Sequence, residues 1–218
     1  WGAGLAPGTR AFFFATLVAY VGIGLFGIPL PLLLAERFRF PTSIVFLFFA
    51  LQNAAVVAAY PWASRRIGRA GNLRVQKGAL AIRLVLFAAT AAALAFYPRP
   101  IPVPVLVVGF AVFGATWSAF SLSGTAIASR LSKSETRGRA LGVFNGVAGV
   151  GWIIAGVGSG YLARWAGYEA AFACGAGFLA LAILILHWVR EPESSDAQDA
   201  PSAAEAERAP TSSGGSAI

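Results

Sequence analysis

The residues of this chain that could do chemistry are polar side chains set inside long apolar runs. Arg83 is the strongest of them, because an ionised side chain in a membrane-buried segment costs at least about 2.5 kcal/mol and is usually functional. Gln52 and Asn53 form an amide pair near the middle of another apolar run, and Asn145 lies near the start of a third. Such side chains can bind a ligand or a neighbouring helix.

Each candidate has a structural alternative. Arg83 is five residues from Gly78, about 7.5 Å of helix rise, so its long stem could carry the guanidinium to the headgroups as an anchor. We favour that role over an anion-handling role in an internal cavity. Gln52 and Asn53 are evenly balanced between ligand binding and helix packing, and a structural role is favoured for Asn145. The aromatic residues Tyr20 and Trp117 could stack on a ligand, although packing is the commoner use of such side chains.

The elements that position these residues are apolar helices. A mean hydropathy of +0.70, with 57% hydrophobic and 12% charged residues, excludes an ordinary soluble domain, which has about 25% charged residues. The pattern predicts an all-α polytopic membrane protein with six transmembrane helices. We place them at 11–35, 42–62, 78–97, 101–127, 140–162 and 170–189. Residues 1–10 lead into the first helix, Pro29 and Pro31 should bend its far end, and 191–218 is predicted to be a disordered acidic tail.

The positive charges predict the orientation. A basic loop at 62–77 holds five of the 17 Lys and Arg residues and no acid, so we expect it on the cytoplasmic side of the cell membrane. With six crossings, eleven cations fall on that side and four on the other, and both ends of the chain are cytoplasmic. Because the cations sit in short loops between apolar runs, the net charge of +8 indicates orientation in a lipid bilayer rather than nucleic-acid binding.

Two segments carry a resemblance to a known family. Arg66, Gly68 and Arg69 match the last Arg, Gly and Arg of the motif Gly-x-x-x-Asp-Arg-x-Gly-Arg, with Pro61 at the first Gly and Arg65 at the Asp. The stretch 137–142 is similar to an Arg-Gly-x-Ala-x-Gly helix entry, and the helix beyond it is rich in glycine. In this order the segments resemble the C-terminal six-helix half of a major facilitator superfamily transporter.

The resemblance implies a fold and a function. The six helices would be the seventh to twelfth of a twelve-helix protein, built as a 3+3 inverted repeat, and a six-helix N-terminal half would be missing, as the absence of any Met also suggests. Gly151, Gly156 and Gly160 would be helix-packing glycines. The activity would be transport of a small solute by alternating access, secondary-active or facilitative, without a cofactor, a metal or enzymatic chemistry. Proton-coupled efflux is the commonest activity in that family, although no carboxylate lies well inside any predicted span.

Two alternatives stay open. Ser123, in the stretch Ser121-Leu122-Ser123-Gly124, and the single histidine His187 are similar to the Ser and His of rhomboid-type intramembrane proteases. Ser121 in place of the first Gly of their motif, and the cytoplasmic position predicted for Ser123, oppose that function. The other alternative is a six-helix membrane subunit that acts only by association. Cys174 is the single cysteine, so the chain has no disulfide framework.

Overall fold

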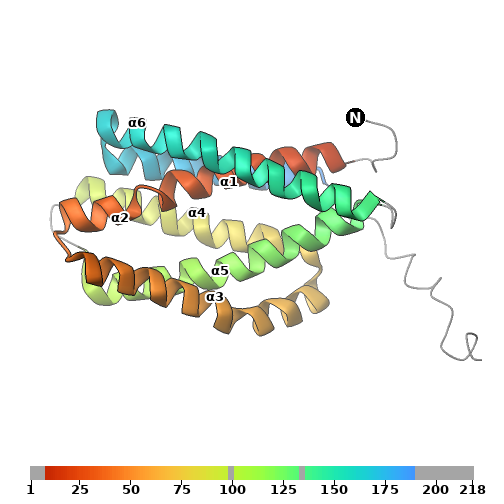
Figure 1. Ribbon diagram of the computed structural model, residues 1–218, viewed down its shortest axis with the longest axis horizontal. Coiled ribbons are helices and arrows are strands. Elements are labelled where there is room, and N and C mark those ends of the chain that lie inside the picture. Colours follow the sequence, from red (N-terminus) through yellow and green to blue (C-terminus); the bar gives the residue numbers. More distant parts are fainter. Residues whose placement is uncertain (1–7, 98–100, 133–135, 190–218) are drawn as a thin grey trace, which may run out of the picture.

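The computed structural model describes residues 8–97, 101–132 and 136–189, and within these ranges the only regular structure is helical. Figure 1 shows a bundle of long, roughly antiparallel helices. Its elements are α1 (Thr9–Gly27), α2 (Leu30–Leu32), the π-helix η1 (Leu33–Arg37), α3 (Thr42–Ala70), α4 (Asn72–Phe96), α5 (Val103–Arg130) and α6 (Arg137–Leu186). Five of the described helices are long and apolar enough to cross a membrane, with α1 to η1 counted as one.

The first helix changes geometry where the sequence has prolines. α1 ends at Gly27, and the single turn of α2 and the π-helix η1 continue it to Arg37. A proline has no backbone N–H and its ring crowds the preceding turn, so Pro29 and Pro31 interrupt the regular α-helical ladder. The bend expected from these two residues therefore lies in a short irregular segment.

The longest helix, α6, is broken at one residue. Its 50 residues would extend about 75 Å if straight, against about 30 Å of hydrocarbon. Gly167 has φ 85° and ψ 166°, a conformation that glycine adopts readily and that no α-helix contains. We therefore describe two arms of α6, arm A (137–166) and arm B (168–186).

Contacts with α1 show that the two arms run in opposite directions. Along arm A the partners advance together with α1, because Phe12 stacks on Phe144 and Tyr20 meets Trp152. Along arm B they run against it, because Phe26 packs on Phe172 while a Cβ at Gly22 would lie 2.8 Å from the carbonyl oxygen of Gly175. The chain therefore reverses at Gly167, and α1 lies between both arms.

The basic segment at 62–77 is not the loop that the sequence predicts. α3 continues through it to Ala70, and α4 begins at Asn72 rather than near Gly78. Only Gly71, at φ 82° and ψ 156°, breaks the helical backbone. Ala, Arg and Ile are acceptable in helices, so charge marks where the chain leaves the hydrocarbon and not where the helix ends. The basic residues are thus carried on the last turns of α3 and the first turns of α4.

The core is aromatic and centred on α1. Phe26 stacks on Phe87 at 3.9 Å between ring centroids and also contacts Phe113 and Phe172, which joins α1, α4, α5 and arm B. Every residue of α1 from Val18 to Phe26 is buried, whereas α3 buries only Val45, Phe48 and Ala63. α1 is therefore the central helix of the bundle, and α3 is peripheral.

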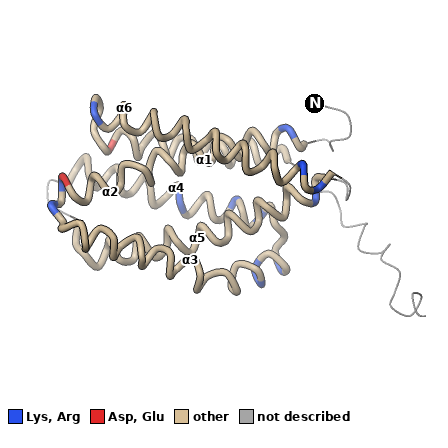
Figure 2. Tube along the Cα trace, viewed as in Figure 1, with Lys and Arg blue, Asp and Glu red and all other residues tan. Residues whose placement is uncertain are grey.

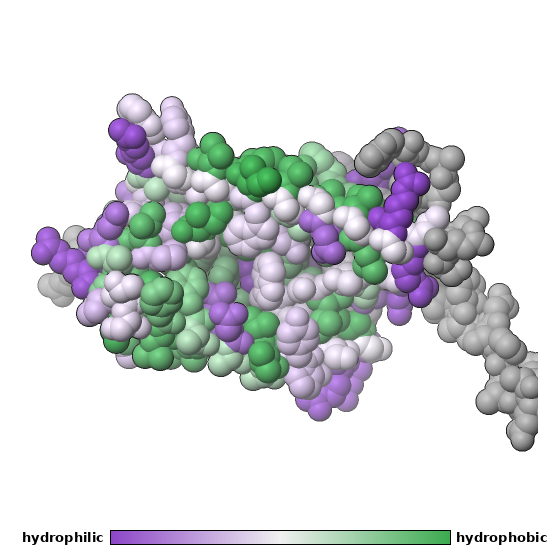
Figure 3. Space-filling view, viewed as in Figure 1, coloured by the Kyte–Doolittle hydropathy of each residue, from purple (hydrophilic) through white to green (hydrophobic). Residues whose placement is uncertain are grey.

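Most charged residues gather at the two ends of the bundle, apart from Lys and Arg positions along α4 (Figure 2), and apolar side chains cover much of the surface between the ends (Figure 3). The two carboxylates in the described ranges lie at the end opposite the basic segment. There Arg37 pairs with Glu169 at 3.3 Å, and the Tyr168 hydroxyl donates to Glu36 at 2.7 Å. Burial, and then this bond to the Glu36 carboxylate, raise the pKa of Tyr168 to about 12, so its phenol stays a neutral donor. These partly exposed contacts join η1 to the α6 reversal but contribute less than about 1 kcal/mol each.

Candidate functional site

Arg83 lies inside the helical bundle. It is 0% exposed, and it falls on the same stripe of α4 as Leu80 and Phe87, which are also fully buried. Its Nη2 donates to the carbonyl oxygen of Phe113 at 2.7 Å. The expectation that Arg83 reaches the headgroups as an anchor is therefore wrong, because its position in the helical period points the stem inward. The buried residues of this stripe are three and four positions apart in the sequence. That spacing alone would have predicted that Arg83 points into the bundle.

The Arg83 guanidinium forms only some of the hydrogen bonds that it could donate. Its Nε and Nη1 have no hydrogen-bond partner among the described residues. Both carboxylates in those ranges, Glu36 and Glu169, lie at the end of the bundle formed by η1 and the α6 reversal, not beside α4's middle. A buried ion without a counter-charge is costly, and each unmet donor adds about 1–3 kcal/mol. The site thus presents a positive charge and free N–H groups that an anionic group would satisfy.

Two other predicted candidates meet at Arg83. The guanidinium carbon lies 4.2 Å from the Phe113 ring centroid and 5.4 Å from the Trp117 ring, both within cation–π range. Tyr20, 6% exposed, packs edge-on against Trp117 at 6.0 Å. We call Tyr20, Arg83, Phe113 and Trp117 the Arg83 cluster. It is assembled from three helices, α1, α4 and α5, and Phe113 is the member that the sequence did not single out.

The remaining polar candidates lie elsewhere. Asn53 is exposed on α3 and donates to the carbonyl of Phe49 in its own helix. Gln52 is half-buried, and its Oε1 has no partner in the described part of the chain. Asn145 is exposed on arm A. Among the described residues, none of these three amides is hydrogen-bonded to Arg83.

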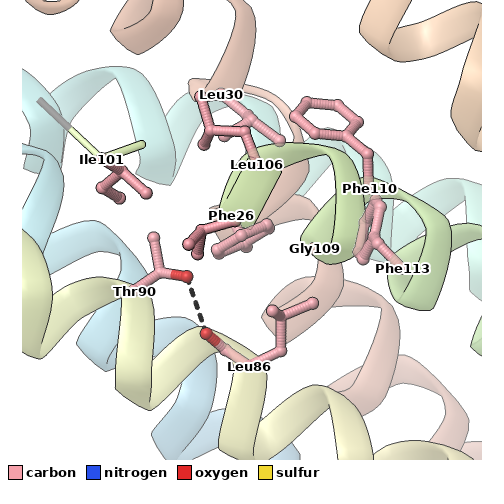
Figure 4. Close-up of a pocket in the computed structure, with 10 residues that line it drawn as sticks. Phe26, Leu30, Leu86, Thr90, Ile101, Leu106, Gly109, Phe110 and Phe113 are labelled. Carbon is pink, nitrogen blue, oxygen red and sulfur yellow. Dashed lines mark hydrogen bonds between the residues drawn. The ribbon is translucent and has the colours of Figure 1, made fainter. Parts of the chain in front are cut away.

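A small apolar pocket lies beside the cluster, between α1, α2, α4 and α5. Figure 4 shows its walls, which include Phe26, Leu86, Gly109 and Phe113. Its volume is about 80 Å³. The hydroxyl of Thr90 is already used, since it donates to the Leu86 carbonyl at 2.7 Å (Figure 4). Without a free polar group to orient a ligand, this pocket is a packing gap rather than a binding site.

Comparison with known proteins decides what kind of molecule this is. A family model described as Major Facilitator Superfamily matches residues 12–216. The chain belongs to the major facilitator superfamily. Members of this superfamily are transporters, so the chain is a multi-pass membrane transporter of that type, and the family inferred from 62–77 and 137–142 is confirmed. A search of curated proteins found no match.

The superfamily-like basic motif lies on the end of α3. Arg65, Arg66, Gly68 and Arg69 are all exposed there. Just beyond the turn, sequence analysis missed Asn72 and Gln76, which are 1% exposed and whose side-chain oxygens have no partner in the described ranges. Their i, i+4 spacing on the buried stripe of α4 was the available signal.

The glycines of arm A differ in their surroundings. A Cβ at Gly151 would lie 2.7 Å from the Cβ of Tyr20, so this glycine lets arm A approach α1 closely. Gly156 is looser, with the Ile28 side chain at 3.8 Å, and a Cβ at Gly160 would meet no described atom within 4 Å. Of the three glycines expected to pack against a neighbouring helix, Gly151 has such a close contact and Gly160 does not. Other tight glycines are Gly22, Gly24, Gly114 and Gly175.

The proposed protease pair has no supporting geometry in this transporter. Ser123 is buried, and its hydroxyl donates to the carbonyl of Ala119 at 2.6 Å. The His187 ring nitrogen Nδ1 contacts the carbonyl of Ile183 at 2.8 Å. Each side chain therefore bonds within its own helix, whereas a serine nucleophile needs a base within hydrogen-bond reach.

Proposed function

We propose that the chain moves a small solute across the cell membrane by alternating access, either as a facilitator or with a coupling ion. Proton-coupled efflux is the commonest form of such transport in this family. The superfamily match over 12–216 is the observation that carries this proposal. The exposed apolar side chains of α3 and arm A, among them Leu47, Val57, Ile153 and Val157, support a second six-helix half as the partner across the transport path.

We further propose six crossings, arranged as two inverted three-helix units, with both ends cytoplasmic. The reversal at Gly167 supports an even number of crossings. Arms A and B are antiparallel, and the length of each is close to or greater than the hydrocarbon thickness of about 30 Å. At 1.5 Å per residue, arm A extends about 45 Å and arm B about 28 Å. The basic segment around Gly71 supports the orientation, since Lys and Arg are retained on the cytoplasmic side.

The Arg83 cluster is the proposed solute-handling element. Its buried charge and two free nitrogens favour a solute with a negatively charged group, such as a carboxylate, while Tyr20 and Trp117 supply aromatic faces. Helix movement during alternating access would open the cluster, which is closed in the present conformation. Asn53 and Asn145, exposed on α3 and arm A, are secondary candidates for the pathway.

A counterflow assay tests the transport proposal. The whole chain, together with the six-helix half proposed to complete the transport path, is reconstituted in liposomes that are preloaded with one unlabelled organic anion or neutral analogue at a time. A carrier that alternates between two faces will concentrate the labelled solute transiently, whereas a channel will only equilibrate it. We expect transient overshoot with at least one anionic solute. Absence of overshoot across the panel would instead support a subunit that acts by association.

Cysteine labelling tests the orientation. In a Cys174→Ser background, which removes the exposed native thiol, the variants Gly68→Cys and Ala166→Cys each place one thiol at an exposed site. A membrane-impermeant maleimide added to intact cells should label the Ala166→Cys variant and should reach the Gly68→Cys variant only after the membrane is opened. Labelling of the Gly68→Cys variant from outside would contradict the proposed topology.

A further inference from the structure

A groove lies between α3 and α4 at the basic end of the bundle, and α5 forms its floor. Its volume is about 630 Å³, within the range of ligand-binding sites. The backbone explains it: α3 and α4 are joined through the single residue Gly71, and beyond this turn α3 packs mainly on α5, whereas α4 packs on α6 and α5 and little on α3. A wedge-shaped space therefore remains between them.

The groove changes chemistry along its length. Arg66 of α3 and Arg74 of α4, both exposed, line it from opposite sides near the Gly71 turn. Further in, the lining is apolar, with Ile82 of α4 and Ala115 of α5. Ile82 lies eight residues, about 12 Å of helix, beyond Arg74. The groove is thus cationic at its mouth and hydrophobic inside.

No carboxylate in the described ranges neutralises this mouth. Glu36 and Glu169 bond at the opposite end of the bundle, and Figure 2 shows Lys and Arg gathered where α3 meets α4. Trp62, 53% exposed, also lines the groove. Tryptophan is enriched at the headgroup level of membranes, so it places this mouth at the lipid–water boundary.

We infer that the groove binds one anionic phospholipid. Its phosphate lies between the Arg66 and Arg74 guanidinium groups, which can bind phosphate oxygens in pairs, and one acyl chain follows the apolar floor of α4 and α5. Basic pockets between transmembrane helices on the cytoplasmic side are suited to anionic headgroups. A free inorganic anion would use the arginines but not the 12 Å of apolar lining beyond them. A lipid bound here would link α3 to α4 across the Gly71 turn.

The test compares two double variants of equal charge. Arg66→Gln with Arg74→Gln removes both guanidinium groups from the groove, while Arg65→Gln with Arg69→Gln removes two neighbouring exposed arginines that do not line it. Purified whole chain is mixed with detergent micelles containing phosphatidylcholine and phosphatidylglycerol, and retained lipid is counted by native mass spectrometry. We expect phosphatidylglycerol affinity to fall about tenfold in the first pair and less than twofold in the second.

A third variant separates a lipid from a free anion. Ala115→Phe fills the floor without touching either arginine, and melting curves in neutral detergent check that each variant is folded. We expect this change to weaken phosphatidylglycerol binding, and we expect millimolar inorganic phosphate not to displace the lipid. Equal loss in both arginine pairs would overturn the inference in favour of diffuse surface charge. Displacement by phosphate with no effect of Ala115→Phe would overturn it in favour of a free-anion site. Neither result bears on whether the chain transports a solute.

Discussion

Replacing Arg83 with methionine is expected to abolish transport and leave the helical bundle folded. The guanidinium is fully buried, has one hydrogen bond to Phe113 and leaves Nε and Nη1 unsatisfied within the described residues. Exchanging such an ion for an apolar side chain of similar length is often neutral or stabilising. If Arg83 pairs with an anionic group of the solute, its loss removes a charge-assisted bond in a dry site, and transport should fall about hundredfold.

The matched variant is Arg83→Lys, which keeps the charge but loses the planar fork of donors. We expect it to retain part of the transport that Arg83→Met loses, with a weaker apparent affinity for the solute found by counterflow. Melting curves in detergent provide the structural control. If Arg83→Met lowers the melting temperature sharply and transport falls only in proportion to the folded fraction, then Arg83 is a packing residue.

Replacing Gly114 with alanine is expected to destabilise the bundle strongly. A Cβ at this position would collide with the carbonyl oxygen of Gln52 and lie 3.1 Å from the Cβ of Ala55, so α5 would have to move away from α3. Backbone atoms cannot yield as a flexible side chain can, and overpacking of this kind costs about 3 kcal/mol. In a chain of this size that lowers the melting temperature by roughly 5–10 °C.

Gly109→Ala provides the control on the same helix. Its Cβ would lie 3.8 Å from Leu86 Cδ1, an ordinary contact at the edge of the apolar pocket of Figure 4. Because alanine favours a helix over glycine by about 1 kcal/mol, we expect this variant to melt slightly higher than the natural chain. Equal melting temperatures for the two variants would show that α3 and α5 are not in close contact at Gly114.

Much of the architecture follows from the sequence. The apolar runs predict the long helices, Pro29 and Pro31 predict the irregular end of the first one, and the basic segments support the family resemblance that the match over 12–216 confirms. The helix boundaries did not follow from it. α3 continues eight residues past its predicted end at residue 62, because leaving the hydrocarbon does not end a helix whose residues favour one.

The candidate site was only partly predictable. Tyr20, Arg83 and Trp117 were each singled out, but their meeting between three helices has no local signal, because they are far apart along the chain. Gly151 and Gly160 show the same limit. Both lie in one glycine-rich helix, yet only Gly151 meets α1 closely, since the surroundings of a glycine depend on which helix lies opposite.

The sequence by itself determined that this chain belongs in a membrane and which segments are apolar helices. It also determined which ends of those helices carry the positive charge. These follow from the partition of each residue between water and hydrocarbon, a local property that adds up along the chain. The tertiary structure alone decided that Arg83 lies under Phe113 and Trp117, that α3 and α4 diverge from Gly71 to leave a groove, and that α6 reverses at Gly167. Those depend on shape complementarity between helices distant in sequence, which no single segment encodes.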